Sequence, residues 1–281
     1  MDLMSLERKS LEIRKDFLKL IYEAGTGHTG SDLSCTDILV ALYYHVLRVD
    51  SKKPKDDNRD RYIQSKGHAV EVLWAILADK GFFPKEELNT FSRFQSRLLG
   101  HPNNKVPGVE MNTGSLGHGL PIAVGSALAA KIDKKMYKTY VLMGDGELAE
   151  GSVWEGAMAA AHYKLDNLIA IIDRNKLQIT GSTEDVMHLD SLHQKWKSFG
   201  WNVIDVQDGN NMEQLLNALT CEPVSEKPTV IIANTLKGKG VAEAEGKANW
   251  HHHVLTTEEY ERSIADLDRK LEDYNGSKYN R

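Results

Sequence analysis

Two apolar runs, separated by an alanine-rich segment with helical spacing, constrain the fold of this chain more than any other feature. The runs occupy residues 139–143 and 168–172. A strand, a helix and a second strand in this order form a βαβ unit, whose two strands are parallel and usually adjacent. Parallel neighbours end at the same edge of the sheet. Residues that follow the two runs are therefore expected to meet there.

The rest of the chain continues this alternation. Beyond residue 138 we predict strands at 138–143, 167–172, 201–206 and 229–234, and helices at 150–163, 191–199 and 211–219. Upstream we predict helices at 5–24, 32–47, 70–78 and 119–131, and a short strand at 61–64. The predicted class is α/β, with a doubly wound, mainly parallel sheet and helices on both faces. We expect one domain over 1–281, with 1–60 as an N-terminal helical and loop extension and 236–281 as a tail with a helix.

Composition narrows the class of protein. The chain is 41% hydrophobic and 27% charged, with a formal net charge of -5, which gives no reason to expect nucleic acid as a partner. No apolar run approaches the roughly 20 residues that span a bilayer, and the N-terminus lacks a signal-peptide pattern. Cys35 and Cys221 are far apart in sequence, so we predict small buried thiols rather than a disulfide, and a cytoplasmic setting.

Oxygen-bearing side chains follow the two strands of the βαβ unit. Asp145 follows the first strand between Gly144 and Gly146, and Asn175 follows the second. Carboxylate and amide oxygens at one sheet edge suit Mg²⁺ or Ca²⁺ held against a diphosphate, with the Leu177 carbonyl as a third ligand. The two glycines allow the backbone to approach an oxyanion closely. The alternative is a strand-end turn and a loop asparagine without a ligand.

Three glutamates follow this first strand end. Glu147 lies at a helix start, where a carboxylate is favoured by the helix dipole, and it also lies beside the expected diphosphate. Glu150 and Glu155 flank Trp154 close to the same place. They are candidates for relaying protons at an interface between active sites, or else ordinary surface carboxylates.

Histidines form a second group of candidate site residues. Five of them lie in glycine-rich loops rather than on apolar helix faces: His28, His68, His101, His118 and His251. We expect these imidazoles to share a cleft, where they can donate to phosphate or hydroxyl groups or move protons near neutral pH. The triplet 251–253 also allows a metal-binding interpretation, but three adjacent residues do not readily face one ion.

Two glycine-containing loops are further candidates. The long polar loop 94–118 is expected to be functional because structureless loops of this length are uncommon in compact domains. Within it, Gly114, Ser115 and Leu116 could form a wall over a cofactor ring, or the segment could be a simple glycine loop. Lys237, after the last strand, is either a contact for diphosphate or substrate, or part of a solvated basic turn.

Several motifs together resemble the diphosphate-binding half of transketolase, and the similarity spans nearly the whole chain. They are Ser-Lys-Gly-His68, Gly-His101-Pro, Pro-Gly-Val-Glu-Met-Asn-Thr-Gly114-Ser-Leu116-Gly, Gly-Asp145-Gly and Asp-Arg-Asn175-Lys. Two positions depart from the family pattern. Thr29 replaces the usual proline, and the glycine that often follows the matching histidine near 251 is absent, so 251 and 252 both remain candidates.

The resemblance implies a cofactor, a set of roles and a partner. The cofactor is thiamine diphosphate with Mg²⁺, or with Ca²⁺ or Mn²⁺. The implied metal ligands are Asp145, Asn175 and Leu177. The diphosphate contacts are His68, Gly146 and His251, and the ring contacts are Gly114 and Leu116. The substrate and proton-transfer residues are His28, His101 and His251, and the interface carboxylates are Glu150 and Glu155.

A full transketolase continues beyond the length of this chain. The resemblance therefore implies the N-terminal subunit of a split enzyme, paired with a C-terminal subunit that carries the pyrimidine-binding domain, in an α₂β₂ assembly. The implied reaction moves a two-carbon ketol unit between sugar phosphates. Rival interpretations are a deoxyxylulose-phosphate-synthase-like enzyme, a 2-oxoacid dehydrogenase E1 α-chain, and a non-catalytic scaffold that binds the cofactor.

Overall fold

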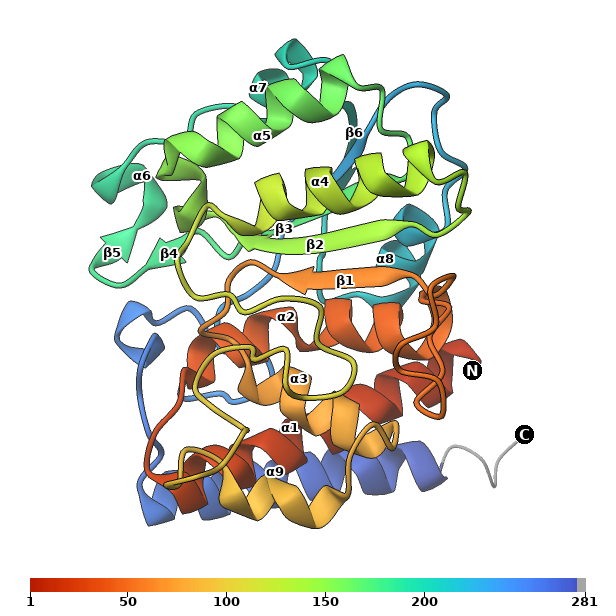
Figure 1. Ribbon diagram of the computed structural model, residues 1–281. Coiled ribbons are helices and arrows are strands. Elements are labelled where there is room, and N and C mark those ends of the chain that lie inside the picture. Colours follow the sequence, from red (N-terminus) through yellow and green to blue (C-terminus); the bar gives the residue numbers. More distant parts are fainter. Residues whose placement is uncertain (277–281) are drawn as a thin grey trace.

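The computed structural model describes residues 1–276 and has a five-stranded sheet between two layers of helices (Figure 1). Every pairing in this sheet is parallel, and the strand order is β1-β2-β3-β7-β6. The strands are β1 (Arg61–Gln64), β2 (Thr139–Gly144), β3 (Leu168–Asp173), β6 (Asn202–Val206) and β7 (Thr229–Ala233). The doubly wound α/β prediction is confirmed.

Helices account for most of the remaining regular structure. The α-helices are α1 (Leu3–Ala24), α2 (Thr29–Ala41), α3 (Glu71–Asp79), α4 (Gly119–Ile132), α5 (Gly151–His162), α6 (Thr183–Val186), α7 (Leu192–Ser198), α8 (Met212–Leu219) and α9 (Thr257–Gly276). Shorter helical segments are the π-helical η1 (Leu42–Val46) and the 3₁₀ turns η2 (Lys85–Thr90), η3 (Gly146–Ala149) and η4 (Ala248–Trp250). The predicted boundaries from 61 onward agree with these to within two residues.

The sheet separates two hydrophobic cores. Successive strand residues point to opposite faces, so Val141 and Met143 of β2 pack with α4, α5 and α7, whereas Tyr140 and Leu142 pack with α1, α2, α3 and α8. In Figure 1 the first group of helices lies above the sheet, and α1, α2, α3 and α9 lie below it. Strands covered on both faces need apolar side chains on both, which is why the sequence shows continuous apolar runs.

The N-terminal helices belong to the lower layer. Asp2 caps α1, and Gly25 ends it in a left-handed conformation with φ 66°. All thirteen residues of α2 are buried, so this helix has no solvent-exposed face. The segment described from sequence as an extension, 1–60, therefore supplies a large part of the lower core. α2 also begins at Thr29, three residues before the predicted start, and its final turn widens into η1.

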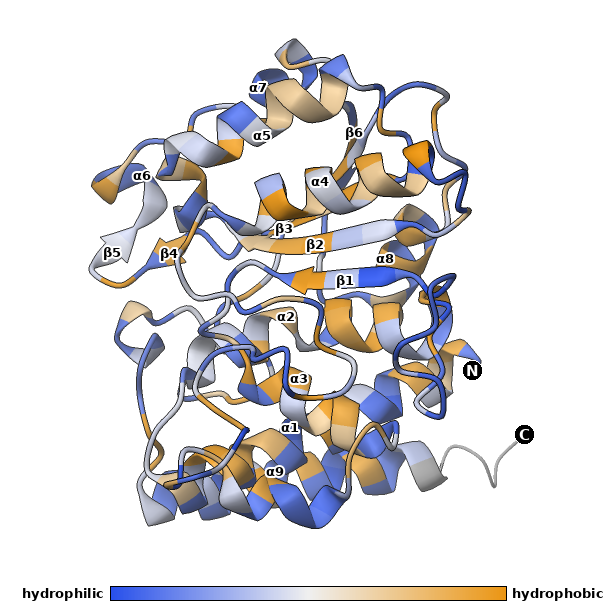
Figure 2. Ribbon diagram, in the orientation of Figure 1, coloured by the Kyte–Doolittle hydropathy of each residue, from blue (hydrophilic) through white to orange (hydrophobic). Residues whose placement is uncertain are grey.

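The C-terminal helix α9 covers the outer side of α1. Thr256 and Glu259 exchange reciprocal hydrogen bonds between side chain and backbone N–H (3.2 and 2.8 Å), which confirms the predicted capping box. The Tyr22 and Tyr260 rings stack 4.3 Å apart, and Leu267 is fully buried. Figure 2 shows bands of hydrophilic and hydrophobic residues along α9, as expected for a helix with one buried face.

Some details differ from the sequence-based expectations. A two-stranded antiparallel hairpin, β4 (Leu177–Gln178) and β5 (Gly181–Ser182), was not predicted. Cys35 is buried, but Cys221 is exposed at the end of α8, so the expectation of two buried thiols is wrong for Cys221. Both thiols are free. None of the helices within residues 1–276 has the length and apolar character needed to cross a membrane.

Candidate active site

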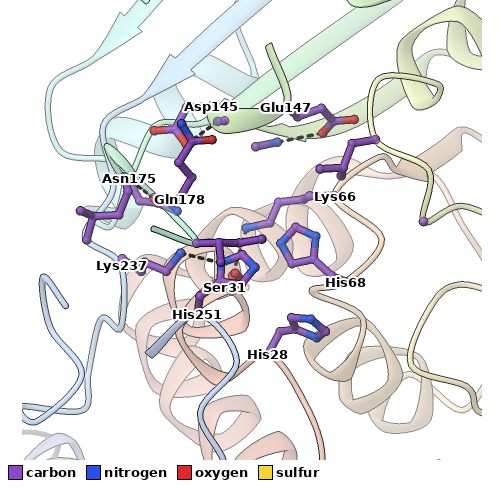
Figure 3. A pocket seen from close by; sticks show the side chains of 16 residues that line it. His28, Ser31, Lys66, His68, Asp145, Glu147, Asn175, Gln178, Lys237 and His251 are labelled. Carbon is purple, nitrogen blue, oxygen red and sulfur yellow. Dashed lines mark hydrogen bonds between the residues drawn. The ribbon is translucent and has the colours of Figure 1, made fainter. Parts of the chain in front are cut away.

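A pocket lies at the carboxyl ends of the parallel strands (Figure 3). The segments that follow β1, β2, β3 and β7 contribute Lys66, Asp145, Asn175 and Lys237 respectively, and His28 at the start of α2 closes one side. In the sheet order, β7 separates β3 from β6, so the chain skips a position and then returns. Ligands in doubly wound sheets bind outside the carboxyl ends of the strands near such a reversal.

The structure brings the two predicted metal-binding side chains to one wall of this pocket. Asp145 is 2% exposed, and its Oδ2 accepts a hydrogen bond from the Lys176 N–H at 2.6 Å. Lys176 has φ 66°, a left-handed conformation that is uncommon for a residue with a side chain. Asn175 and Leu177, on either side of it, both line the pocket. Lys176 thus links the segment after β3 to Asp145 at the end of β2.

The donor set on this wall fits a hard divalent cation. It includes a carboxylate and a side-chain amide, which carry the oxygen ligands that Mg²⁺ and Ca²⁺ prefer, and Leu177, the predicted carbonyl ligand, lines the same pocket. Within residues 1–276 no group of three or more His, Cys, Asp or Glu side chains could hold a metal on its own. A cation at Asp145 and Asn175 would therefore require further oxygens from a bound ligand, as a diphosphate would supply.

The backbone at Gly146 is closely covered by the β4–β5 hairpin. A Cβ added at Gly146 would lie 2.8 Å from Gln178 Oε1, so no larger residue fits without displacing that side chain. Gln178 and Ile179 of this hairpin line the pocket, although neither was predicted as a site residue. The hairpin gives no signal of its own in the sequence, because a four-residue ladder is too short to show an apolar period.

A buried ion pair forms the floor of the pocket. Lys66 Nζ lies 2.5 Å from Asp173 Oδ2, and the two residues are 2% and 0% exposed. Asp173 also accepts hydrogen bonds from the hydroxyls of Ser34 and Thr235. Although burial opposes the charge, Asp173 raises the pKa of Lys66, which therefore stays cationic. Both residues stand in the motifs quoted above, but sequence reasoning assigned them no role.

Glu147 lies in the first turn of η3 and links three segments of the chain. Its Oε1 accepts from the Ser65 hydroxyl and from the Gly117 N–H at 2.7 Å, and its Oε2 accepts from the Gly144 N–H at 3.1 Å. Burial raises the pKa of this carboxyl, and the hydrogen bonds counteract that rise. The predicted position at a helix start is confirmed, and the side chain also bonds segments beyond that helix. Glu147 lines the pocket and braces the glycine loop that contains Leu116.

The opposite wall is a cluster of imidazoles centred on His28. Figure 3 shows His28 and His68 across the pocket from Asp145 and Asn175. Around the His28 ring, the other ring centroids lie at 4.6 Å (His252), 5.2 Å (His68), 5.7 Å (His251) and 6.5 Å (His101). His118 is exposed and outside this cluster, so its predicted membership is wrong. His252, considered only as an alternative to His251, is inside it.

The three consecutive histidines each face a different neighbour. His251 lines the pocket and its Nδ1 is 3.0 Å from Lys237 Nζ, while the His252 ring lies against His28. His253 Nε2 lies 2.9 Å from Glu259 Oε2. A Cβ at Gly30 would lie 2.5 Å from the Trp250 carbonyl, so this close approach seats the His251 segment on the start of α2.

Burial keeps the pocket histidines neutral. It is the main cause that lowers the pKa of His28 to about 4 and of His251 to about 3, helped by His252 for the first and by Lys237 for the second. Burial, together with Lys66, also lowers the pKa of Lys237 to about 8. Lys237 is 1% exposed, which excludes the solvated-turn interpretation of this residue. The neutral His251 Nδ1 accepts from the Lys237 ammonium.

Acid is expected to destabilise the folded chain because of these two histidines. Their folded-state pKa values lie below the ordinary 6.5, so the unfolded chain binds protons that the folded chain refuses. The stability is fully present above pH 6.5 and is lost as pH falls toward about 4 for His28 and about 3 for His251. We expect the thermal midpoint to fall less steeply with acid in His251→Gln than in the parent protein. Equal slopes would contradict this assignment.

Several predicted site residues lie at the rim of the pocket or outside it. Ser115, Glu150 and Glu155 are exposed and do not line it. Glu150 nevertheless touches the glycine loop, because a Cβ at Gly117 would lie 2.5 Å from the Glu150 Cβ. His101 is exposed at the edge of the cluster and packs on Gly114. The roles predicted for these residues remain predictions.

Comparison with known proteins agrees with this architecture. Residues 9–271 match the family model described as transketolase, thiamine diphosphate binding domain. The chain is 50% identical over 273 residues to an apulose-4-phosphate transketolase subunit of Phocaeicola vulgatus, covering 97% of both chains. It is 40% identical over 269 residues to a 6-deoxy-6-sulfo-D-fructose transketolase subunit of Clostridium sp., covering 95% of this chain and 98% of that one.

Solved structures give the same result for the fold. Transketolase from Campylobacter jejuni superposes with a TM-score of 0.85 at 30% identity. The match covers 98% of this chain and 48% of that one, so the chain spans about half the length of the solved enzyme. A family model matched along most of the chain, relatives matched end to end and a shared fold lead to one conclusion. This chain belongs to the transketolase family, in which it corresponds to the N-terminal, thiamine diphosphate-binding domain.

Proposed function

We propose that this chain is the diphosphate-binding subunit of a transketolase that moves a two-carbon ketol unit from a ketose phosphate to an aldose phosphate. The observation that carries the proposal is the pocket itself, with oxygen donors on one wall and neutral imidazoles on the other. The relatives that match along their full length are named as transketolase subunits, which supports this reaction over the oxoacid dehydrogenase and synthase alternatives.

The oxygen-bearing wall is proposed to hold the cofactor's diphosphate through a cation. Asp145, Asn175 and the Leu177 carbonyl would bind Mg²⁺, with Ca²⁺ or Mn²⁺ as substitutes. Lys237, His251 and His68 face the same space and can donate hydrogen bonds to phosphate oxygens. When bound, thiamine diphosphate supplies the nucleophilic carbon and the electron sink for the ketol unit. The residues of the protein would bind and orient the cofactor and the substrate, and would move protons.

The histidine wall is proposed to handle substrate hydroxyl groups. A neutral imidazole has one donor nitrogen and one acceptor nitrogen, so it can take a hydroxyl proton and return it. His28, His101 and His251 stand within one cluster, which suits a polyol substrate with several hydroxyls. Glu150, which touches the glycine loop, and Glu155 are both exposed, and they are proposed to work at a contact between subunits.

A second subunit is proposed to complete the site. The pocket has a volume of about 250 Å³. This is smaller than the roughly 300–1,000 Å³ of complete ligand sites. Ile179 lines the pocket yet is 71% exposed, which leaves an apolar side chain for a partner to cover. We propose that a C-terminal subunit with the pyrimidine-binding domain covers it, in an α₂β₂ complex located in the cytoplasm.

Activity is expected to require both subunits. The test mixes this chain with its partner, thiamine diphosphate and Mg²⁺, and measures ketol transfer from apulose 4-phosphate, 6-deoxy-6-sulfo-D-fructose and other ketoses to an aldose phosphate. Each chain alone should be at least about 100-fold less active than the complex, because half of the acid–base groups would be missing. A complex that binds the cofactor but transfers nothing from any ketose would favour the scaffold alternative.

A further inference from the structure

Two buried carboxyl groups, Asp32 and Glu71, lie behind the histidine cluster and have no role in the chemistry described above. They are 0% and 1% exposed. Asp32 Oδ1 accepts a hydrogen bond from the Val72 N–H at 3.0 Å. Among the described residues, no protein donor reaches Asp32 Oδ2 or either oxygen of Glu71. Three of the four carboxyl oxygens of this pair are therefore buried without a hydrogen-bond donor from another residue within 1–276.

The Asp32–Val72 hydrogen bond places the two carboxyl groups beside one another, because Val72 directly follows Glu71 and the two buried carboxyl groups interact strongly. An ionised carboxylate is only an acceptor, so a contact between two such groups requires a proton between them. Burial raises the pKa of Asp32 to about 7 and raises that of Glu71 well above its ordinary value, where Asp32 adds to the rise. The pair consequently keeps at least one proton near neutral pH.

The surroundings do not remove that proton. The titratable groups facing the pair are the Lys66 ammonium, from the segment after β1, and the Cys35 thiol of α2. Lys66 favours an ionised Asp32, but its ammonium is already bound to Asp173 at 2.5 Å. The first turns of α2 and α3 also favour one negative charge at this position. A pair that holds one shared proton and one negative charge satisfies both the contact between the carboxyl groups, which needs a proton, and the surroundings, which favour a negative charge.

Each carboxyl group lies at the start of a helix close to a pocket histidine. Asp32 is in the first turn of α2, after His28, and Glu71 begins α3, three residues after His68. The Asp32 N–H donates to the His28 carbonyl at 3.1 Å. Glu71 Oε1 would lie 3.0 Å from a Cβ on Gly27, the residue before His28. A bond between Asp32 and Glu71 therefore joins the two turns whose imidazole rings stand 5.2 Å apart.

We propose that Asp32 and Glu71 form a proton-sharing carboxyl pair that fixes the spacing of His28 and His68, so that both are positioning residues for the proposed reaction. The proposal rests on the proposed function for its effect on turnover, but the pair itself is testable without it. Removing one carboxyl frees the two helix starts to separate. An amide in place of one carboxyl keeps a donor and an acceptor in the same shape and removes the need for a proton.

The test compares Glu71→Gln, Glu71→Ala and, as a control, Glu86→Gln on the exposed η2 turn, each in the complex with the partner subunit. Glu71→Ala should lower kcat at least about tenfold, since misplacing a reacting group by about 1 Å can cost more than that. In the parent enzyme kcat should decline at alkaline pH, above the range in which the pair holds its shared proton, because the second charge drives the pair apart. Glu71→Gln should lose this decline, whereas Glu86→Gln should keep it. An unchanged alkaline decline in Glu71→Gln would overturn the proposal.

Two readouts separate this proposal from the proposed function. Infrared spectra above pH 7 should show the band of a buried protonated carboxyl group in the parent protein and in Glu86→Gln, but not in Glu71→Gln. Nuclear Overhauser contacts between the His28 and His68 rings should persist in Glu71→Gln and vanish in Glu71→Ala. A missing band, or ring contacts that survive in a folded Glu71→Ala, would overturn the carboxyl pair even if ketol transfer is found. Should Glu71→Ala not fold, the pH profile and infrared band of Glu71→Gln decide alone.

Discussion

Replacing Asp145 with alanine is expected to abolish binding of thiamine diphosphate with Mg²⁺. Asp145 is the carboxylate among the three proposed ligands, and its loss leaves an amide and a carbonyl, which are weak ligands for a divalent cation without a counter-charge. Changing a residue that merely orients a metal ligand costs 10- to 100-fold in affinity, so losing the ligand should raise the Kd by at least about 100-fold. Titration calorimetry on the complex with the partner subunit measures this.

Two controls separate loss of the metal from loss of the fold. Asp133→Ala removes an exposed carboxylate at the end of α4 and should bind the cofactor normally. In the parent protein, a chelator should reproduce the Asp145→Ala behaviour, and added Mg²⁺ should reverse it. Arg174, which bonds Asp145 at 3.1 Å, retains Thr183 and Glu184 as partners, so the variant should fold. Undiminished cofactor affinity in Asp145→Ala would contradict the metal assignment.

Replacing Lys66 with methionine is expected to produce the largest loss of stability. The substitution leaves Asp173, which is fully buried, without its cation. Removing one partner of a buried ion pair typically costs about 3 to 5 kcal/mol in the free energy of unfolding. For a chain of this size that corresponds to a thermal midpoint lower by roughly 10 °C. Calorimetric or fluorescence-monitored thermal unfolding at neutral pH checks the value.

A surface ion pair and a double variant provide the matched comparisons. Lys131 pairs with Asp166 at 2.7 Å, but both side chains are about one-third exposed, so Lys131→Met should cost less than about 1 kcal/mol. Adding Asp173→Asn to Lys66→Met removes the stranded charge and should recover much of the loss. If Lys66→Met melts no lower than Lys131→Met, the floor of the pocket does not depend on this pair.

Much of the fold could be predicted because each strand carries its own evidence. The run 168–172 is apolar on both faces, and such a run in an alternating chain indicates a strand covered by helices on both sides. The positions of Asp145 and Asn175 followed from the same pattern, because parallel neighbours end at a common edge. The reciprocal bonds of Thr256 and Glu259 are equally local, since a capping box needs only four consecutive residues.

Other features depend on residues that are distant in sequence. Asp32 is 39 positions from Glu71 and Lys66 is 107 positions from Asp173, so no local period indicates either pair. The orientations of His251 and His252 also depend on tertiary packing, which places the first beside Lys237 and the second against His28. Glu147 illustrates the same limit, because two of its donors, Ser65 and Gly117, are 82 and 30 positions away in the sequence.

The sequence by itself determined the order of strands and helices along the chain and the two apolar faces of the sheet. It also determined which kinds of side chain follow the strands at the carboxyl edge of the sheet. These depend on side-chain periodicity and on end-of-element residues, which act over a few positions. Only the tertiary structure decided which of those groups are buried together, which carry charge and which stay neutral. Burial and pairing set the free energy of ionisation, and both arise when segments far apart in the chain come into contact.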